Sequence, residues 1–224
     1  QGAAVRARGG SIGVKNKNIR PLRGKPLIAH SIIQAKKTRL FDLIAVSSDS
    51  KNILDLSKTW GADYLIDRPA HLASAVAHKH PAIQHAVLAT EHHYSKQFDA
   101  IIDLDATSPL RLADDIITAF NILMSHDHAM NLVTACPARR SPYFNMLEMK
   151  KDGYTCLVKQ PPEVICRRQD TPACFDMNAS IYIWKRAGLF ESNSVLTDRT
   201  LLYVMPEERS IDIDSMLDWK VVSL

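Results

Sequence analysis

Short apolar runs alternate with stretches of helical periodicity along most of the chain. Runs of strand length are found at Ala3–Ala7, Leu43–Ser47, Asp63–Ile66, Ala100–Leu104, Leu132–Cys136, Ala179–Lys185 and Leu201–Met205. Apolar spacing of three and four residues predicts helices at His30–Lys37, Ile53–Trp60, Pro81–Thr90, Asp114–Met124 and Ser215–Val221. The alternation predicts a three-layer α/β fold, with a mostly parallel, Rossmann-like sheet and helices on both faces. Such sheets bind ligands beyond the carboxyl ends of their strands.

One stretch, residues 139–171, breaks this rhythm. It is rich in Pro, Arg and Lys, and Lys151-Asp152-Gly153 is a hairpin-turn signal between two strand-like pieces. We interpret it as a small β-rich lobe, inserted into a single domain of residues 1–224, that caps the site or pairs with a second subunit.

Composition narrows the class of protein only a little. The chain has 224 residues, 28 of them basic and 24 acidic, for a net charge of +4. This mild excess fits a small anionic substrate as well as nucleic acid. No apolar run reaches the ~18 residues that a membrane-spanning helix needs. Four cysteines without a C-x-x-C pair argue against a zinc knuckle and for reduced thiols in the cytoplasm.

The strongest chemical signal follows the first predicted strand. Ala7-Arg8-Gly9-Gly10-Ser11-Ile12-Gly13 leads into Lys15, Lys17 and Asn18. Glycines let backbone N–H groups approach a phosphate closely, and Arg8 and Lys17 add fixed positive charge. The segment is neither a Walker A sequence nor a G-x-G-x-x-G fingerprint. Taken alone, a plain glycine-rich turn with solvated lysines explains it equally well.

The resemblance to a known family lies in an ordered set of segments. They are Arg8-Gly9-Gly10-Ser11, Lys17-Asn18, Gly24-Lys25-Pro26-Leu27-Ile28, Val46-Ser47-Ser48-Asp49-Ser50, Arg68-Pro69-Ala70, Thr107-Ser108-Pro109-Leu110-Arg111, Arg168-Gln169, Asn178-Ala179-Ser180-Ile181-Tyr182 and Ser210-Ile211-Asp212-Ile213-Asp214. Together they resemble the CMP-sialic acid synthetases, or acylneuraminate cytidylyltransferases, over nearly the whole chain. Residues 103–109 and 143–145 are most similar to the bacterial enzymes that activate legionaminic-type acids.

The resemblance implies a reaction. CTP and a nine-carbon nonulosonic acid, such as N-acylneuraminate or legionaminate, would give the CMP-sugar and pyrophosphate, by attack of the anomeric hydroxyl on the α-phosphate. It implies Mg²⁺ as the cofactor and a homodimer paired through residues 139–171. A cytoplasmic enzyme with neither nucleic acid nor membrane as partner is expected.

The resemblance also assigns roles on the nucleotide side. Arg8 and Lys17 match the positions that hold the triphosphate together with Ser11, and Asn18 and Arg68 match positions near the ribose and cytosine. Arg8, Lys17, Asp212 and Asp214 are the expected catalytic groups.

Asp212 and Asp214 match the pair that binds Mg²⁺. In an extended segment, side chains at i and i+2 share one face, so the spacing suits a hard oxygen site. The alternative is that Asp214 caps the helix that follows.

On the sugar side, Arg168 matches the arginine that faces the sugar carboxylate, and Asn178 and Tyr182 match positions near the sugar pocket. Asp105 stands where many relatives carry Gln. It could bind a sugar hydroxyl, bind a second metal ion, or cap the next turn, and the residues alone do not decide.

The chain departs from the family pattern in two places. Ile12 replaces a Lys, and Ser74-Ala75-Val76-Ala77-His78 replaces a polar segment, so that His78 or Lys79 is expected to supply nucleotide contacts instead. These departures support one alternative, a nucleotide-binding homologue that has lost catalysis.

Asp103-Leu104-Asp105 supports another alternative, a sugar-nucleotide glycosyltransferase with a D-x-D metal motif. We expect Asp103 on the opposite strand face, under a helix, which disfavours that reading. The sequence fixes neither the nonulosonic acid nor the number of metal ions.

Overall fold

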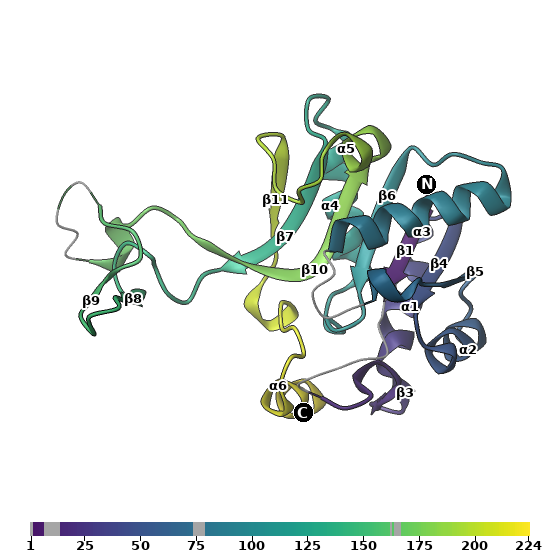
Figure 1. Ribbon diagram of the computed structural model, residues 1–224, viewed down its shortest axis with the longest axis horizontal. Coiled ribbons are helices and arrows are strands. Elements are labelled where there is room, and N and C mark those ends of the chain that lie inside the picture. The colour runs from purple at the N-terminus through teal and green to yellow at the C-terminus, as the bar shows by residue number, and fades with distance from the viewer. Residues whose placement is uncertain (1, 7–13, 74–78, 162, 164–166) are drawn as a thin grey trace.

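Seven strands of the described residues form one sheet. The computed structural model describes residues 2–6, 14–73, 79–161, 163 and 167–224. The strand order is β11-β7-β10-β6-β1-β4-β5 (Figure 1). The bounds are β1 Gly2–Arg6, β4 Leu43–Ser48, β5 Tyr64–Asp67, β6 Ala100–Asp105, β7 Asn131–Pro137, β10 Phe175–Lys185 and β11 Thr200–Val204. Only β10 runs antiparallel to its neighbours in this described sheet, so the expected mostly parallel α/β fold is confirmed.

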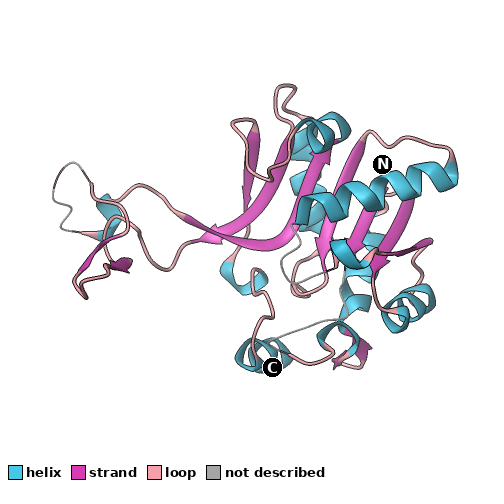
Figure 2. Cartoon of the chain, in the orientation of Figure 1, coloured by secondary structure: helices cyan, strands magenta, loops and turns pink. Residues whose placement is uncertain are grey.

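Helices cover both faces of the sheet (Figure 2). Their bounds are α1 Leu27–Thr38, α2 Lys51–Thr59, α3 Lys79–Tyr94, α4 Ala113–Met124, α5 Arg186–Glu191 and α6 Met216–Ser223. Side chains of α1, α2 and α4 share one buried cluster with Ile102 and Leu104 of β6. Side chains of α3 and α5 share a second cluster with Ile101. The result is three layers, helices–sheet–helices. Among the described residues, every helix is too short or too polar to span a membrane.

Alternation along β6 decides where its two aspartates point. Ile102 and Leu104 face α1 and α4, whereas Ile101 faces α3. Since strand side chains alternate with a period of two, Asp103 and Asp105 both lie on the α3 face. The expectation that Asp103 lies on the face opposite Asp105 is therefore wrong. Its burial under a helix is confirmed, because Asp103 is fully buried and contacts Lys79 of α3.

The stretch of residues 139–171 projects from the sheet between the ends of β7 and β10 (Figure 1). It contains a two-stranded antiparallel hairpin, β8 (Leu147–Met149) and β9 (Thr155–Leu157). Gly153 supplies the turn at φ +87°, a conformation that favours glycine, so the predicted hairpin is confirmed. Large apolar side chains stay exposed on it, including Leu147, Met149 and Tyr154.

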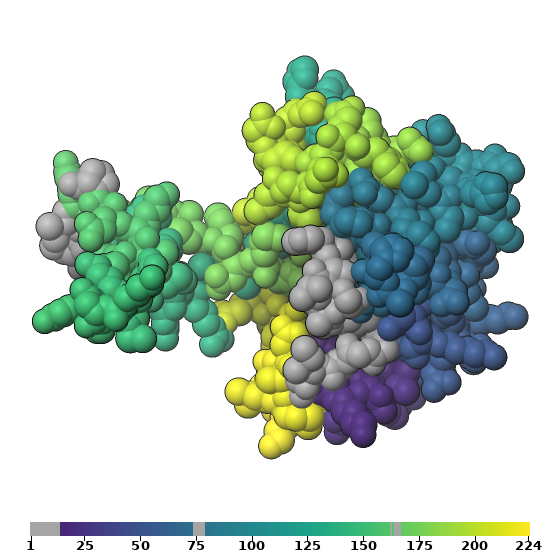
Figure 3. All heavy atoms as spheres, in the orientation of Figure 1, coloured from purple at the N-terminus to yellow at the C-terminus, as the bar shows by residue number. Residues whose placement is uncertain are grey.

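Two short elements near the amino end pack against the carboxyl-terminal segment. They are the 3₁₀ helix η1 (Lys17–Ile19) and the hairpin of β2 (Pro21–Leu22) and β3 (Lys25–Pro26). Leu22 joins a buried cluster with Ile213 and Trp219. The two segments lie side by side in Figure 3, where they are purple and yellow. Packing thus brings residues from the two ends of the sequence to one place.

Candidate active site

Most of the predicted site residues that the structure describes gather at one edge of the sheet. Parallel register aligns Ser48 of β4 with Asp67 of β5, and Arg6 of β1 with Asp105 of β6. The carboxyl ends of these strands therefore meet, as expected for the ligand edge of such a sheet. Because β10 is antiparallel, its amino half, near Ile181, reaches the same edge beside Leu104.

Lys17 reaches the carboxyl-terminal segment across this edge. Its Nζ donates to the backbone oxygen of Ile213 and lies 3.4 Å from Oδ1 of Asp214. The Lys17 side chain is 12% exposed and that of Asp214 is 79% exposed. The expected convergence of a basic group from the beginning of the chain with the acidic pair from its end is confirmed for Lys17. Arg8 and Ser11 lie outside the described residues.

Asp212 lies deeper than Asp214 and is held in an unfavourable environment for a charge. Burial, helped by the nearby charges of Asp105 and Asp214, raises its carboxyl pKa to about 6, against a hydrogen bond from Thr107 and the charge of Lys17. Oδ1 of Asp212 is buried and has no hydrogen-bond partner among the described residues. A divalent cation would satisfy this oxygen and relieve the repulsion, so the donor set fits Mg²⁺.

Asp214 does not cap the last helix. Ser215 does so, because its Oγ accepts a bond from the backbone N of Asp218 at 3.2 Å. Oδ2 of Asp218 in turn accepts from the backbone N of Ser215 at 2.7 Å, which completes a capping box. The alternative role of Asp214 as the helix cap is therefore wrong, and its side chain stays exposed beside Lys17.

Asn18 lies in η1 and Arg68 directly follows β5, and both are buried. Arg68 donates from Nε to Oγ of Ser47 at 3.2 Å and from Nη2 to the Ser47 backbone oxygen at 2.5 Å. The guanidinium is thus fixed at the end of β4. Contacts of both residues with the nucleotide stay predictions.

Asp105 caps the turn that follows β6. Its Oδ1 accepts from Oγ1 of Thr107 at 3.1 Å and from the Thr107 backbone N at 3.4 Å. Its Oδ2 lies 3.6 Å from Nζ of Lys79. Of the three roles considered for Asp105, the structure shows the cap, and the contact with a sugar stays a prediction.

Lys79 contacts acidic groups of the protein itself. Its Nζ lies 3.2 Å from Oδ2 of Asp103, in addition to the contact with Asp105. The ring of Tyr182 lies under the ammonium, 3.4 Å from Nζ to the ring centroid. Tyr182 is buried and stacks on Trp184 at 5.9 Å. The expected roles of Lys79 at the nucleotide and Tyr182 at the sugar stay predictions.

Arg111 is a buried structural residue of the site that sequence reasoning missed. Its Nη1 donates to the backbone oxygens of Asp105 and Ser180, each at 2.8 Å, and Nη2 donates to Oγ of Ser31. Burial lowers its pKa to about 10, while the charges of Asp105 and Asp103 act in the opposite direction. The guanidinium ties β6, β10 and α1 together, and its place in the Thr107–Arg111 segment was the only signal.

Asn178 is also enclosed by the protein. Its Nδ2 donates to Oγ of Ser210 at 3.0 Å, and its Oδ1 accepts from Oγ1 of Thr134 at 2.7 Å. It sits where the pairing of β10 with β7 shifts register, next to Ala179 with φ +51°. The side chain joins β7, β10 and the segment that leads to Asp212, and its contact with a sugar stays a prediction.

Arg168 belongs to the projecting lobe and is not brought together with Lys17 and Asp212. It begins the 3₁₀ helix η3 (Arg168–Asp170), and its Nη2 donates to the backbone oxygen of Ala138 at 2.8 Å. The side chain is exposed. A role at the sugar carboxylate stays a prediction.

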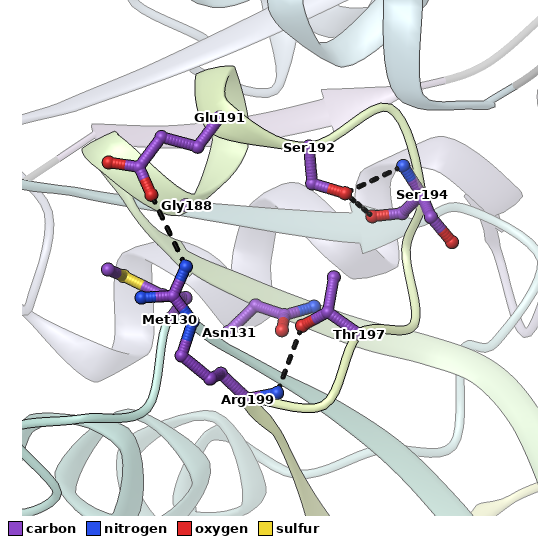
Figure 4. A pocket seen from close by; sticks show the side chains of 8 residues that line it. All are labelled: Met130, Asn131, Gly188, Glu191, Ser192, Ser194, Thr197 and Arg199. Atoms are coloured by element: carbon purple, nitrogen blue, oxygen red, sulfur yellow. Dashed lines mark hydrogen bonds and ion pairs between the residues drawn. The ribbon is translucent and has the colours of Figure 1, made fainter.

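Two hollows lie at the opposite edge of the sheet, near the amino ends of β7 and β11. The smaller, of about 50 Å³, is shown in Figure 4. Nη2 of Arg199 lies 3.5 Å from Oε2 of Glu191 at its wall. The larger, of about 290 Å³, is lined by residues 126–129 and 198–201. Among the described residues, no predicted site residue lines either hollow, so the candidate site is the edge that holds Lys17 and Asp212.

Comparison with known proteins agrees with this geometry. The family described as Cytidylyltransferase matches residues 3–191. The chain belongs to the cytidylyltransferase family. It is 47% identical over 216 residues to post-translational flagellin modification protein B of Campylobacter coli, covering 96% of this chain and 90% of that one. It is 46% identical, with the same coverage, to CMP-N,N'-diacetyllegionaminic acid synthase of Campylobacter jejuni.

The fold of this cytidylyltransferase recurs in solved structures. A CMP:2-keto-3-deoxy-manno-octonic acid synthetase complexed with CTP aligns with a TM-score of 0.66 at 14% identity, covering 99% of this chain and 95% of that one. At this identity the likeness concerns the fold alone. The sequence resemblance to the cytidylyltransferases and the expected fold are both confirmed.

Proposed function

We propose that this cytidylyltransferase activates a nonulosonic acid of the legionaminic type with CTP. The anomeric oxygen of the sugar forms a bond to the α-phosphorus, the bond from that phosphorus to the bridging oxygen breaks, and pyrophosphate leaves while the hydroxyl proton is released. The observation that carries the proposal is the contact of Lys17 with the Asp212–Asp214 segment at the ligand edge of the sheet. The relative from Campylobacter jejuni named as a CMP-N,N'-diacetyllegionaminic acid synthase supports the choice of sugar class.

Lys17 acts on the triphosphate in this proposal. Its ammonium is nearly buried, so the charge is poorly screened and interacts strongly with phosphate oxygens. Because Lys17 also donates to the Ile213 backbone, it fixes the distance between the phosphates and the acidic pair. Positioning and charge stabilisation are the main protein contributions to transfer reactions at phosphorus.

Asp212 and Asp214 would hold Mg²⁺. Oδ1 of Asp212, which is buried and has no partner in the part of the chain that the structure describes, and the exposed carboxylate of Asp214 offer a partial oxygen site. Such a site suits an ion that keeps waters and substrate phosphates as its other ligands. When bound, the ion supplies positive charge against the developing charge of pyrophosphate. The protein contributes the fixed carboxylates and the dry surroundings of Asp212.

A homodimer formed through the lobe belongs to the same proposal, as does a cytoplasmic location. The lobe exposes Leu147 by 63%, Met149 by 76% and Tyr154 by 74%, which is typical of a surface that is covered by a partner. Light scattering should give twice the mass of the chain. A stable monomer at working concentration would contradict the dimer.

The test of the function is release of pyrophosphate from CTP and Mg²⁺ with three acids in parallel: legionaminic, N-acetylneuraminic and pseudaminic acid. We expect the fastest release with the legionaminic-type acid. Binding of CTP by calorimetry with no turnover on any acid would instead favour a homologue that has lost catalysis. Hydrolysis of a sugar nucleotide without use of CTP would favour a glycosyltransferase.

A further inference from the structure

The ammonium of Lys79 lies between the two carboxylates of an Asp-x-Asp pair. Nζ is 3.2 Å from Oδ2 of Asp103 and 3.6 Å from Oδ2 of Asp105. The ring of Tyr182 faces the ammonium at 3.4 Å, so an aromatic π-face adds to the negative surroundings. This is the arrangement of ligands around a cation, and here the cation is part of the chain.

The position of Lys79 in its own helix points to a specific role. Lys79 is the first described residue of α3, and near the amino end of a helix the dipole disfavours positive charge by ~0.3–1 kcal/mol. The two carboxylates reverse that preference. Asp103 in particular is fully buried, and a carboxylate in such a place needs a cation beside it.

We propose that Lys79 is a positioning residue that takes the place of a second divalent ion. Resting on the proposed function, this assigns the metal to Asp212 and Asp214 and leaves Asp103 and Asp105 to the lysine. Oδ1 of Asp105 then stays available to hold the turn at Thr107, whose backbone oxygen accepts from the Ile213 backbone N at 2.9 Å. Lys79 thereby keeps the metal segment in place without touching the ion.

The experiment counts bound Mn²⁺ on the full chain without CTP or sugar, by the loss of the free-ion signal in electron paramagnetic resonance. K79M should bind one more Mn²⁺ per chain than the wild type, because two carboxylates that lie side by side on one strand face lose the ammonium that neutralises them. K79M/D105N and the charge-conserving K79R should both return to the wild-type number.

K185M is the matched control. Lys185 is also bonded within the protein, donating to the backbone oxygens of His126 and Asp127, but it lies at the opposite edge of the sheet. Its removal should leave the Mn²⁺ count unchanged. A folded K79M, judged by circular dichroism, with the wild-type count would overturn the proposal.

Instability of K79M has its own test. K79M/D103N removes one charge of each sign, so it should fold and melt at a higher temperature than K79M. If it does not, Asp103 does not depend on Lys79 and the proposal fails. Because the counts need no substrate, they decide this proposal even if no acid releases pyrophosphate.

Discussion

The molecule carries two Asp-x-Asp pairs with the same spacing and opposite surroundings. Asp103 and Asp105 lie inside a strand, with the ammonium of Lys79 within 3.6 Å of both. Asp212 and Asp214 lie in an irregular segment before the last helix, and Asp212 has a buried oxygen without a partner among the described residues. The difference teaches that spacing alone does not make a metal site, because a fixed cation in the fold can fill the position first.

Removal of the Asp212 charge should have the largest effect of the changes considered, because it leaves the Asp212–Asp214 pair with a single carboxylate. D212N should slow pyrophosphate release roughly 10²- to 10³-fold, because charge stabilisation by a metal ion accounts for several kcal/mol. Initial rates at saturating CTP would measure it. D127N, at the opposite edge of the sheet, is the control and should keep the wild-type rate. A D212N enzyme of normal rate would exclude Asp212 as a metal ligand.

Removal of Arg111 should destabilise the strands and helix around the Asp103–Asp105 pair. R111M removes the guanidinium donor to the Ser180 backbone oxygen and the Ser31 hydroxyl, and leaves the Asp105 backbone oxygen with only the weaker bond from Ser31, so we expect a loss of about 3 kcal/mol in unfolding free energy. Urea denaturation would measure it. The matched change R199M removes an exposed pair with Glu191 and should cost less than about 0.5 kcal/mol. Equal losses would contradict the structural role of Arg111.

The pKa of Asp212 predicts that the same D212N change stabilises the fold at neutral pH. The folded-state pKa of about 6 lies above the ordinary aspartate pKa of 3.8, so the Asp212 charge destabilises the fold increasingly from about pH 4 to pH 6 and fully above that range. Without divalent ions, D212N should be more stable than the wild type by about 2 kcal/mol at pH 7.5. The advantage should vanish as the pH falls below 4, where the carboxyl is protonated in both states. Melting curves at the two pH values would measure it, and a constant difference would contradict the raised pKa.

The smallest expected effect concerns the capping of α6, the helix that follows Asp212 and Asp214. S215A removes the cap of α6 and should cost about 1 kcal/mol of unfolding free energy. It should leave the Mn²⁺ affinity nearly unchanged, because Asp214 does not serve as the cap. S223A, which removes a bond to the Trp219 backbone in the last turn of the same helix, is a suitable control for the loss of a hydroxyl. A large loss of affinity in S215A alone would tie the cap to the metal segment.

Much of the fold could be predicted because each strand of the seven-stranded sheet and most helices carry their own periodicity. The helix α5, Arg186–Glu191, was missed, since it is short and depends on packing. At Gly188 a Cβ atom would lie 2.8 Å from the Met130 backbone oxygen, so glycine permits a contact that no local pattern encodes. The face of Asp103 follows from strand alternation alone, which places Asp103 with Asp105 and Ile101.

Those parts of the candidate site that lie in segments resembling the family could be predicted. Contacts that depend on how separate elements pack together could not. The meeting of Lys17 with Asp214 follows from matched segments at both ends of the chain. The pairing of Lys79 with Asp103 joins a helix residue and a strand residue that are 24 positions apart, and no local sequence pattern predicts this contact. The burial of Arg111 likewise depends on three elements packing together.

The packing of Ile213 and Trp219 against Leu22 has a consequence for biosynthesis. Every strand of the main sheet is translated before Asp212, so a nascent chain can build the scaffold while it still lacks both acidic residues proposed for the metal. The guanidinium of Arg20, 4.7 Å above the ring of Trp219, marks where the late segment docks. The proposed metal site can therefore form only after the sheet has been synthesised, once the carboxyl-terminal segment packs against the amino-terminal hairpin.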